Sequence, residues 1–468
     1  MKLIRSPRRR SGRVIKMVRT AASNVIHHTP PALEMVIGLL VLIGVGSGLL
    51  MWPGAAVRPL TAMDAIFTST SASAVTGLSL FSPATTLTIW GQIILLILAQ
   101  IGGVSLIVAV SVVSFVLGRE VTLSRRLSVT SSIGLDNPGQ IMRIMVRAMV
   151  LMLTIEGVGA FLLYIHWRLS GIVPAGEAGF YGLFHAVMSF CNAGFDLFTG
   201  LPQYPNGIPT DPVTLLIMGT LIFLGGLGIP VYMNLIFGRK RHWLSLHTKV
   251  TLFTAVVLVA VGWVGLLLSE YWNSGVLEKM PLFQRVTITL FQSVATRTAG
   301  FSSLPGFDHI NAATGLLLII LMMIGTAPAS TGGGITTGTF AVLVFAVISY
   351  ARGYDHIRIG KRSIPNSLIQ KALVILMLSL SLVIAGTWLL LYTNPFSMTD
   401  TLFEVVSAFS TTGLSMGITS SLNHFGLWVL IVMMFCGRLG AVTIMIAMLG
   451  REPRKRLVEY PEESILIG

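Results

Sequence analysis

Four short turns in this 468-residue chain carry residue types suited to holding a partly dehydrated cation. Each turn follows a predicted short helix and contains one key glycine: Gly77, Gly194, Gly300 and Gly413, spaced 117, 106 and 113 residues apart. Backbone carbonyl oxygens can replace the hydration shell of a cation. Aiming successive carbonyls at one axis requires dihedral angles that glycine tolerates. The turns lack a ring of charged side chains, which favours carbonyl coordination over a divalent or anion site.

The candidate site consists of each glycine and the two residues before it. Threonines in these turns can add hydroxyl oxygens, and Asn192 does so less regularly. Glycines in membrane helices often serve only to let helices approach closely, but recurrence at one place in four repeats favours a site. The candidate residues are Val75, Thr76, Gly77, Asn192, Ala193, Gly194, Thr298, Ala299, Gly300, Thr411, Thr412 and Gly413.

The elements that position these turns are apolar segments long enough to cross a bilayer. A spanning helix needs about 20 apolar residues. The sequence predicts eight such segments, at 35–52, 88–117, 144–167, 213–237, 250–272, 314–350, 368–392 and 426–449. Between the members of each pair lies a stretch too short or too polar to cross, at 59–80, 178–198, 281–302 and 398–416. We therefore expect an all-α integral membrane protein with eight transmembrane helices, arranged as four helix–pore loop–helix repeats around one central pore.

The repeat boundaries follow from this pattern. They are a basic leader at 1–34, repeats at 35–117, 144–237, 250–350 and 368–449, and a tail at 450–468. Phe67, Phe184 and Phe403 lie ten residues before the key glycine of their repeat, and Phe291 lies nine before its own. Two stretches have capping-box spacing at a helix start, Thr61 with Asp64 and Thr401 with Glu404.

Composition supports the membrane prediction and charge orients it. The chain is 53% hydrophobic and 11% charged, against about 25% charged in a typical globular protein. Lysine and arginine cluster beside alternate apolar segments, whereas the other connections are acidic. The positive-inside rule places the basic clusters and both termini in the cytoplasm. The net charge of +14 therefore reflects the orientation of the chain in a lipid membrane, and no nucleic-acid partner is expected.

The sixth apolar segment is too long and is interrupted by glycines, a proline and hydroxyl residues. Because such residues break a helix, we expect a loop inside the membrane that serves as a gate, rather than a passive packing kink. It lacks the Gly-Lys-Ser/Thr ending of a nucleotide-binding loop, so no nucleotide is expected on this chain itself. With an intramembrane arginine midway along the last segment, the candidate gate residues are Gly325, Pro328, Ser330, Thr331, Gly332, Gly333, Gly334, Thr336, Gly338 and Arg438.

Three charged residues inside apolar segments or turns need an explanation. Arg438 is expected to hold loop carbonyls near Gly332–Gly334, or to form a positive barrier below the turns. Glu156 is expected in a buried polar pair, and Arg297 is expected to turn behind the third turn toward a carboxylate such as Glu404 or Asp64. The two cysteines and nine histidines show no metal spacing, and no nucleophile–base pair supports an enzyme.

The four turns resemble the filters of the Trk/Ktr/HKT potassium-transporter superfamily, and within it the membrane subunit of bacterial Ktr systems. The motifs are Ser73-Ala74-Val75-Thr76-Gly77-Leu78-Ser79, Cys191-Asn192-Ala193-Gly194-Phe195, Thr296-Arg297-Thr298-Ala299-Gly300-Phe301 and Ser410-Thr411-Thr412-Gly413-Leu414-Ser415. The resemblance implies K⁺ at the filter residues, a homodimer with one pore per subunit and a gating loop in the bacterial cytoplasmic membrane. It also implies a cytoplasmic nucleotide-binding ring subunit as regulator and Na⁺ as an activator. A Trk-type symporter coupled to protons or Na⁺ remains the alternative, and a membrane scaffold with structural loops is the non-transport rival.

Overall fold

The computed structural model describes residues 31–104, 141–204, 207–237, 244–273, 280–304, 306–307, 310–354, 356–359, 362–440 and 443. Within these ranges the chain is almost entirely helical, with one two-stranded hairpin, β1 (Arg358–Ile359) and β2 (Arg362–Ser363). Most of the predicted leader, the predicted tail and the second half of the predicted segment 88–117 lie outside the described residues.

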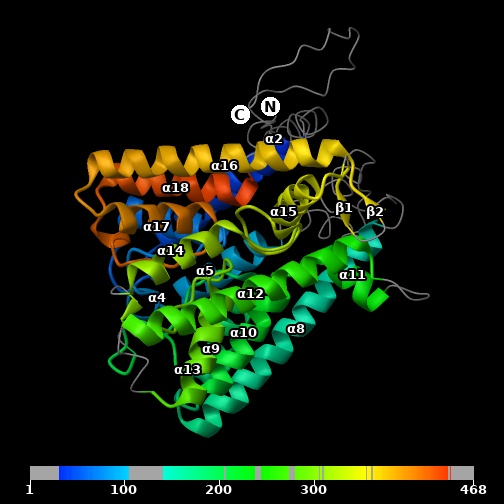
Figure 1. Ribbon diagram of the computed structural model, residues 1–468. Coiled ribbons are helices and arrows are strands. Elements are labelled where there is room, and N and C mark those ends of the chain that lie inside the picture. The colour runs from blue at the N-terminus through cyan, green and yellow to red at the C-terminus, as the bar shows by residue number, and fades with distance from the viewer. Residues whose placement is uncertain are drawn as a thin grey trace, which may run out of the picture.

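The helices fall into two groups, long apolar helices and shorter helices between them (Figure 1). The long helices are α2 (Pro31–Leu50), α8 (Ile141–Ser170), α12 (Leu246–Asn273) and α16 (Asn366–Thr393). Four short helices precede the glycine turns: α3 (Ala62–Ser73), α9 (Ala178–Cys191), α13 (Leu282–Ala295) and α17 (Met398–Phe409). The others are α4 (Pro83–Thr86), α5 (Ile89–Gly103), α10 (Pro212–Gly225), α11 (Ile229–Phe237), α14 (Ala312–Met323), α15 (Thr337–Ala351), η2 (Thr419–Ser421) and α18 (His424–Leu439).

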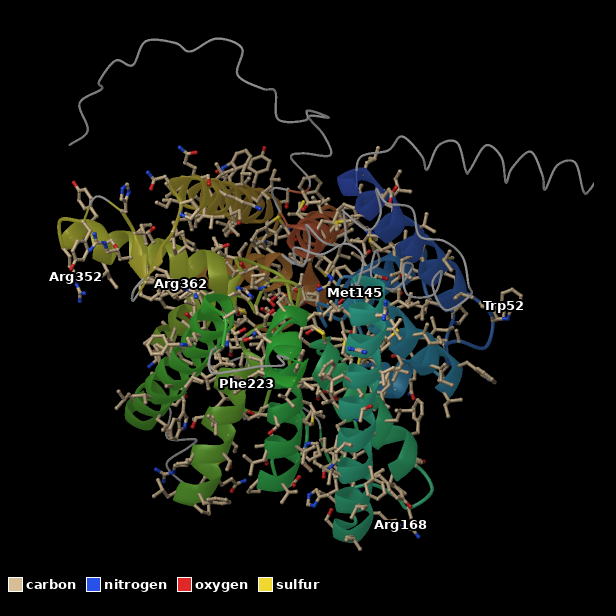
Figure 2. The ribbon with its side chains drawn as sticks, turned by 90° about the vertical axis from the view of Figure 1, so that its right-hand side faces the viewer. Trp52, Met145, Arg168, Phe223, Arg352 and Arg362 are labelled. Atoms are coloured by element: carbon tan, nitrogen blue, oxygen red, sulfur yellow. The ribbon has the colours of Figure 1, made fainter. Side chains whose placement is uncertain are left out.

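The distribution of side chains is the reverse of that in a water-soluble protein. Large apolar residues point outward along the long helices, as at Phe253 and Ile384, which are 65% and 67% exposed. Hydroxyl residues of the short helices are fully buried, as at Thr70 and Ser407. Among the described helices, α2, α8, α12 and α16 are long and apolar enough to cross a membrane, and the bent pair α10–α11 makes a fifth candidate. Figure 2 shows α8 running from Met145, near the middle of the view, to Arg168 at its lower end.

Three of the four short helices pack between the two flanking helices of their own part of the chain: α3 contacts α2 and α5, α9 contacts α8 and α10, and α17 contacts α16 and α18. α13 instead lies against α12 and against α10 of the preceding part of the chain. In Figure 1, α16 and α18 lie side by side with α17 beneath them. This packing buries the ends of the short helices in the middle of the molecule.

Side-chain caps fix where the helices after the turns begin. Asp211 accepts the Thr214 N–H at 2.9 Å ahead of Pro212, and Asn423 accepts the Gly426 N–H at 2.7 Å. Thr88 and Asn311 cap α5 and α14 in the same way. The first amides of a helix have no partner within the helix, and in a membrane they have no water either. These caps therefore set the helix starts.

Three expectations from the sequence need correction. The fourth apolar segment is not one helix: α10 and α11 meet at a 97° bend around Gly226–Gly228. Arg438 is not at mid-helix, because α18 ends at Leu439 and Gly440 caps it with a φ of 79°. Thr61 and Asp64 form the predicted capping box of α3, but α17 starts at Ser397, which caps Asp400; the Thr401–Glu404 pair lies inside that helix.

The interruption expected in the sixth segment is a real break in the helix. α14 ends at Met323 and α15 begins at Thr337, capped by the Thr336 side chain. We call the residues between them, Ile324–Thr336, the α14–α15 loop.

Candidate functional site

The four key glycines meet in a closed ring. A Cβ at Gly77 would lie 2.7 Å from the carbonyl oxygen of Ala193, and one at Gly194 would lie 2.9 Å from that of Ala299. The same relation holds for the other two, so each glycine abuts the carbonyl that precedes the next glycine. In order round the ring, the pairs are Gly77 with Ala193, Gly194 with Ala299, Gly300 with Thr412, and Gly413 with Thr76. Segments about 110 residues apart thus surround one axis.

All four turns share one unusual backbone conformation. The residue two before each glycine adopts a positive φ, although none of these residues is glycine: Val75 (58°), Asn192 (59°), Thr298 (71°) and Thr411 (52°). The glycines themselves have φ between 68° and 94°. A positive φ is costly for β-branched residues. Because it occurs at the same position in all four turns, we infer that the surrounding packing imposes this conformation.

Polar oxygens without a partner lie in these turns. Thr76 Oγ1, Thr411 Oγ1 and Asn192 Oδ1 are buried and accept or donate no hydrogen bond within the protein. The Asn192 amide donates to Thr298 Oγ1 at 3.2 Å. Buried polar atoms normally have partners, so these oxygens are available to a ligand on the ring axis.

The α14–α15 loop lies directly against one side of the ring. A Cβ on Gly332 would overlap the Thr298 hydroxyl, and one on Gly333 would lie 2.6 Å from the Thr411 hydroxyl. Both ends of the loop are tied together, because the Gly325 N–H donates to Ile335 O at 2.8 Å. The loop therefore starts and ends at the same place, where Gly325 and Ile335 are hydrogen-bonded; we call this place its neck. Its glycines Gly332 and Gly333 lie against the third and fourth turns.

The loop is hydrogen-bonded to the bend between α10 and α11. The Ala327 N–H donates to Gly226 O at 3.0 Å, and the Ile229 N–H donates to Ala329 O at 3.1 Å. The Thr331 hydroxyl donates to Gly225 O at 3.1 Å. The bend exposes the carbonyls and amides that a continuous helix would have used internally, and the loop satisfies them.

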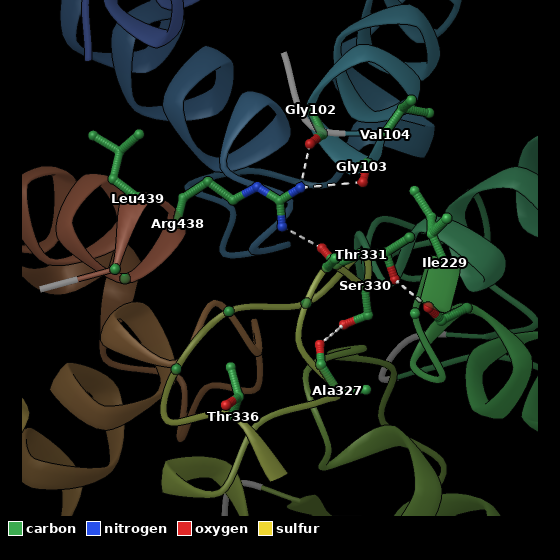
Figure 3. A pocket seen from close by; sticks show the side chains of 18 of the residues that line it. Gly102, Gly103, Val104, Ile229, Ala327, Ser330, Thr331, Thr336, Arg438 and Leu439 are labelled. Atoms are coloured by element: carbon green, nitrogen blue, oxygen red, sulfur yellow. Dashed lines mark hydrogen bonds between the residues drawn. The ribbon is translucent and has the colours of Figure 1, made fainter. Parts of the chain in front are cut away.

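Arg438 joins the loop to a different helix end (Figure 3). Its guanidinium donates to Thr331 O and Gly102 O, and to Gly103 O at 3.2 Å. One side chain thus bonds carbonyls from the α14–α15 loop and from the end of α5. Of the two roles expected for Arg438, this geometry fits the holding of loop carbonyls, at Thr331 rather than at Gly332–Gly334.

A cavity of about 360 Å³ lies beside this network. Its lining includes Ser73 and Phe190 from the ends of α3 and α9, the loop residues Gly332 and Gly333, and Arg438. The other candidate gate residues that line it are Ser330, Thr331, Gly334 and Thr336. Gly325, Pro328 and Gly338 lie at the neck and base of the loop instead, where Gly325 contacts Gly333 and Gly338 packs on Pro328.

Glu156 and Arg297 lie behind the turns. The Gln100 amide donates to both carboxylate oxygens of Glu156, at 3.2 and 3.1 Å, which supplies the polar partner expected from the sequence. The expectation for Arg297 is wrong in its partner. Arg297 donates to Gly325 O at 3.1 Å and to Ala255 O at 3.4 Å, two carbonyls rather than Glu404 or Asp64. The end of α14 at Met323 leaves Gly325 O free for a guanidinium, whereas Ala255 lies inside α12; backbone acceptors of this kind carry no signal in the sequence.

Sequence reasoning missed three helix glycines that bring the turns together. Gly102, Gly225 and Gly437 each press on the carbonyl of the residue four before a ring glycine, namely Ser73, Phe190 and Phe409. A side chain at any of them would overlap that carbonyl. The available signal was the pairs Gly102-Gly103, Gly225-Gly226 and Gly437-Arg438 at one place in their repeats.

Together, outward apolar helices and the closed ring of re-entrant turns define a multi-pass α-helical membrane protein. Comparison with known proteins gives the family: the TrkH cation transport protein family matches residues 35–460. The chain belongs to this family of transporters, as the four turns indicated, and is not an enzyme.

Two curated relatives are both Ktr system potassium uptake proteins B. The protein of Bacillus subtilis is 33% identical over 97% of this chain and 99% of its own length. That of Vibrio alginolyticus is 33% identical over 90% of this chain and 91% of its own length. The potassium/sodium uptake protein NtpJ of Enterococcus hirae is 30% identical over 87% of this chain and 90% of its own.

A solved structure has the same fold. The potassium transporter TrkH from Vibrio parahaemolyticus superposes with a TM-score of 0.68 and 19% identity, covering 89% of this chain and 84% of that one.

Proposed function

We propose that this chain is the K⁺-translocating subunit of a Ktr-type uptake system in the bacterial cytoplasmic membrane. Its ion filter is formed by the four turns Val75–Gly77, Asn192–Gly194, Thr298–Gly300 and Thr411–Gly413. The observation that carries this proposal is the closed ring, in which Thr76, Ala193, Ala299 and Thr412 each present a carbonyl beside the key glycine of the preceding turn in the ring. Such a ring of backbone oxygens suits a dehydrated monovalent cation, and the names of the Ktr relatives agree with K⁺ as that cation.

The repeat organisation belongs to the same proposal. Eight spans in four helix–pore loop–helix units require that α5, α10–α11, α14–α15 and α18 each count as one crossing, although they are short or broken. The caps at the start of these helices and the glycines near their ends recur at equivalent places. Both termini and the cavity below the ring then face the cytoplasm, as the basic clusters indicate.

The α14–α15 loop is the proposed gate. It lies beneath Thr298 and Thr411, where it blocks the axis on which an ion would leave the ring. Arg438 holds it there and places a positive charge beside the cavity, which a passing cation would meet at short range. A cytoplasmic nucleotide-binding ring subunit would open it by moving the helix ends, with the chain present as a homodimer and Na⁺ as activator.

The test is K⁺ uptake at limiting K⁺ in a host stripped of its own uptake systems. The native chain is compared with Gly300→Asp, with and without a regulatory ring subunit, at equal membrane abundance. A Cβ at Gly300 would overlap Thr412 O and lie 3.1 Å from the Gly413 Cα. Gly306→Asp is the matched control, because Gly306 also has a positive φ, 63°, but has no atom within 4 Å of the added Cβ.

We expect uptake from the native chain and from Gly306→Asp, and none from Gly300→Asp. Uptake by Gly300→Asp equal to that of the native chain would remove the filter proposal, and uptake no higher than the host's background in all three would favour a scaffold role. The same assay separates the second candidate, a coupled symporter, which the name of the potassium/sodium relative NtpJ favours. Uptake that follows an imposed Na⁺ or pH gradient at fixed membrane voltage would identify coupling.

A further inference from the structure

A polar residue follows the buried phenylalanine of each short helix. The four phenylalanines are Phe67, Phe184, Phe291 and Phe403, and the residues after them are Thr68, His185, Gln292 and Glu404. All eight side chains are 2% exposed or less. Burying a polar group is costly unless it is hydrogen-bonded, so four such residues at one register position indicate a common structural task.

Two of the four, His185 and Gln292, accept the same backbone amide, that of the third residue after the ring glycine. His185 Nε2 accepts the Leu197 N–H at 3.2 Å, while its Nδ1 donates to Tyr181 O at 2.8 Å. Gln292 Oε1 accepts the Ser303 N–H at 2.9 Å.

Glu404 holds the fourth turn at a later residue. One oxygen of its carboxylate accepts the hydroxyl of Thr419, six residues after the ring glycine. Histidine, glutamine and glutamate share little except an acceptor atom on a side chain of this length. What recurs in repeats 2 to 4 is therefore a buried side-chain acceptor for the chain that follows the glycine, and not one residue type.

The first repeat lacks this bond. Thr68 occupies the equivalent position, but its hydroxyl has no hydrogen-bond partner. The first turn is instead held at its glycine, because the Gly77 N–H donates to Ser71 Oγ at 3.1 Å. The fourth turn has both kinds of bond: the Gly413 N–H donates to Ser407 Oγ at 3.0 Å, and Glu404 accepts a bond from the chain after the glycine.

The start of each glycine turn is hydrogen-bonded to a main-chain carbonyl near the C-terminal end of the short helix that precedes it. The Thr76 N–H donates to Ser71 O at 2.7 Å, and the Thr412 N–H donates to Ser407 O at 2.8 Å. Ala193 and Gly300 make the corresponding bonds to Met188 O and Ala295 O. In repeats 2 to 4, the residues around the key glycine are therefore strung between two anchors on one helix, a main-chain carbonyl and a buried side-chain acceptor.

We propose that His185, Gln292 and Glu404 are positioning residues for ion discrimination. Each fixes the outer end of its turn and thereby the placement of the carbonyls around the axis. The inference rests on the proposed function, because discrimination between K⁺ and Na⁺ depends on how those carbonyls are arranged. Thr68 makes no such hydrogen bond, so the placement of the first turn depends on the bond from the Gly77 N–H to Ser71 instead.

The test measures the Na⁺ concentration that halves K⁺ uptake for the native chain and three variants at equal membrane abundance. Gln292→Leu is close in size but removes the acceptor, Gln292→Glu retains an acceptor oxygen, and Thr68→Val is the matched control at the same level. Leaving the Ser303 N–H unpaired destabilises the native turn. We expect Gln292→Leu to lower discrimination against Na⁺ at least about fivefold, and the other two variants to stay within about twofold of native.

Native discrimination by an abundant Gln292→Leu would overturn the inference, as would an equal loss in Thr68→Val. Should Gln292→Leu fail to reach the membrane, the pair His185→Leu and His185→Gln repeats the comparison in the second repeat, where native discrimination by His185→Leu overturns it. K⁺ uptake by the native chain in the same assay tests the proposed function separately. A native chain that transports K⁺ beside variants that keep their discrimination refutes only the positioning role.

Discussion

The guanidinium of Arg438 donates to the carbonyl of Thr331 across 107 residues of sequence. The same side chain bonds the end of α5, and Thr331 also bonds the end of α10 through its hydroxyl. A single loop residue is thus held by two elements that are distant in the chain. The loop has no helix of its own, so at Thr331 its position depends on these bonds, while its neck and base are held by the bonds of Gly325, Ala327 and Ala329.

Replacing Arg438 by glutamine is expected to raise the initial rate of K⁺ uptake in the absence of a regulatory subunit. A hydrogen bond from a charged donor contributes about 1.5–3 kcal/mol, so its loss shifts the balance between seated and displaced loop about tenfold or more. Arg168→Gln is the control, since Arg168 is an exposed arginine at the far end of α8 (Figure 2). An unchanged rate in an equally abundant Arg438→Gln chain would argue against the latch.

Thr331→Val is expected to act in the same direction but more weakly. The substitution keeps the shape of the side chain and the carbonyl that Arg438 bonds, and removes only the donor to Gly225 O. A neutral hydrogen bond contributes about 1 kcal/mol. Because both variants loosen one residue, the double variant should raise uptake by less than the product of the single effects. Strictly multiplicative effects would show that the two contacts act on different steps.

Much of this arrangement follows from local signals in the sequence. The turns are predictable because each has a glycine nine or ten residues after a phenylalanine, and the α14–α15 break is predictable because it contains several glycines close together. The α10–α11 bend was not predictable: Gly226-Leu227-Gly228 lies in an apolar stretch, and glycine is common in membrane helices.

The polar residues behind the turns are harder to recognise for a different reason. Thr68, His185, Gln292 and Glu404 differ in type, so no residue pattern marks their position. Only the hydrogen bonds reveal that three of them accept a bond from the chain after the ring glycine. Likewise, Arg297 bonds one carbonyl just after the end of α14, at Gly325, and one inside α12, at Ala255, and neither partner carries a side-chain charge that the sequence would show.

Gly225→Ala is expected to lower both stability and uptake, whereas Gly219→Ala in the same helix should not. A Cβ at Gly225 would overlap the Phe190 carbonyl at the end of α9, but one at Gly219 would meet only the Phe291 ring at 3.4 Å. Alanine is favoured over glycine inside a helix by about 0.5–1 kcal/mol, so Gly219→Ala should be neutral or slightly stabilising. Thermal unfolding of the purified proteins in detergent compares them, and equal melting temperatures would show that α9 and α10 can separate freely.

Glu156→Leu is expected to destabilise the protein by about 1–3 kcal/mol, since it leaves a half-buried amide donor of Gln100 without its acceptor. Glu156→Gln retains one carbonyl oxygen and should lose less. Glu177→Gln, at an exposed position before α9, is the control and should match the native melting temperature. Native stability in Glu156→Leu together with altered K⁺ uptake would contradict a structural role. It would mean that the carboxylate acts on the ion through its charge, because the bond to Gln100 is then dispensable for folding.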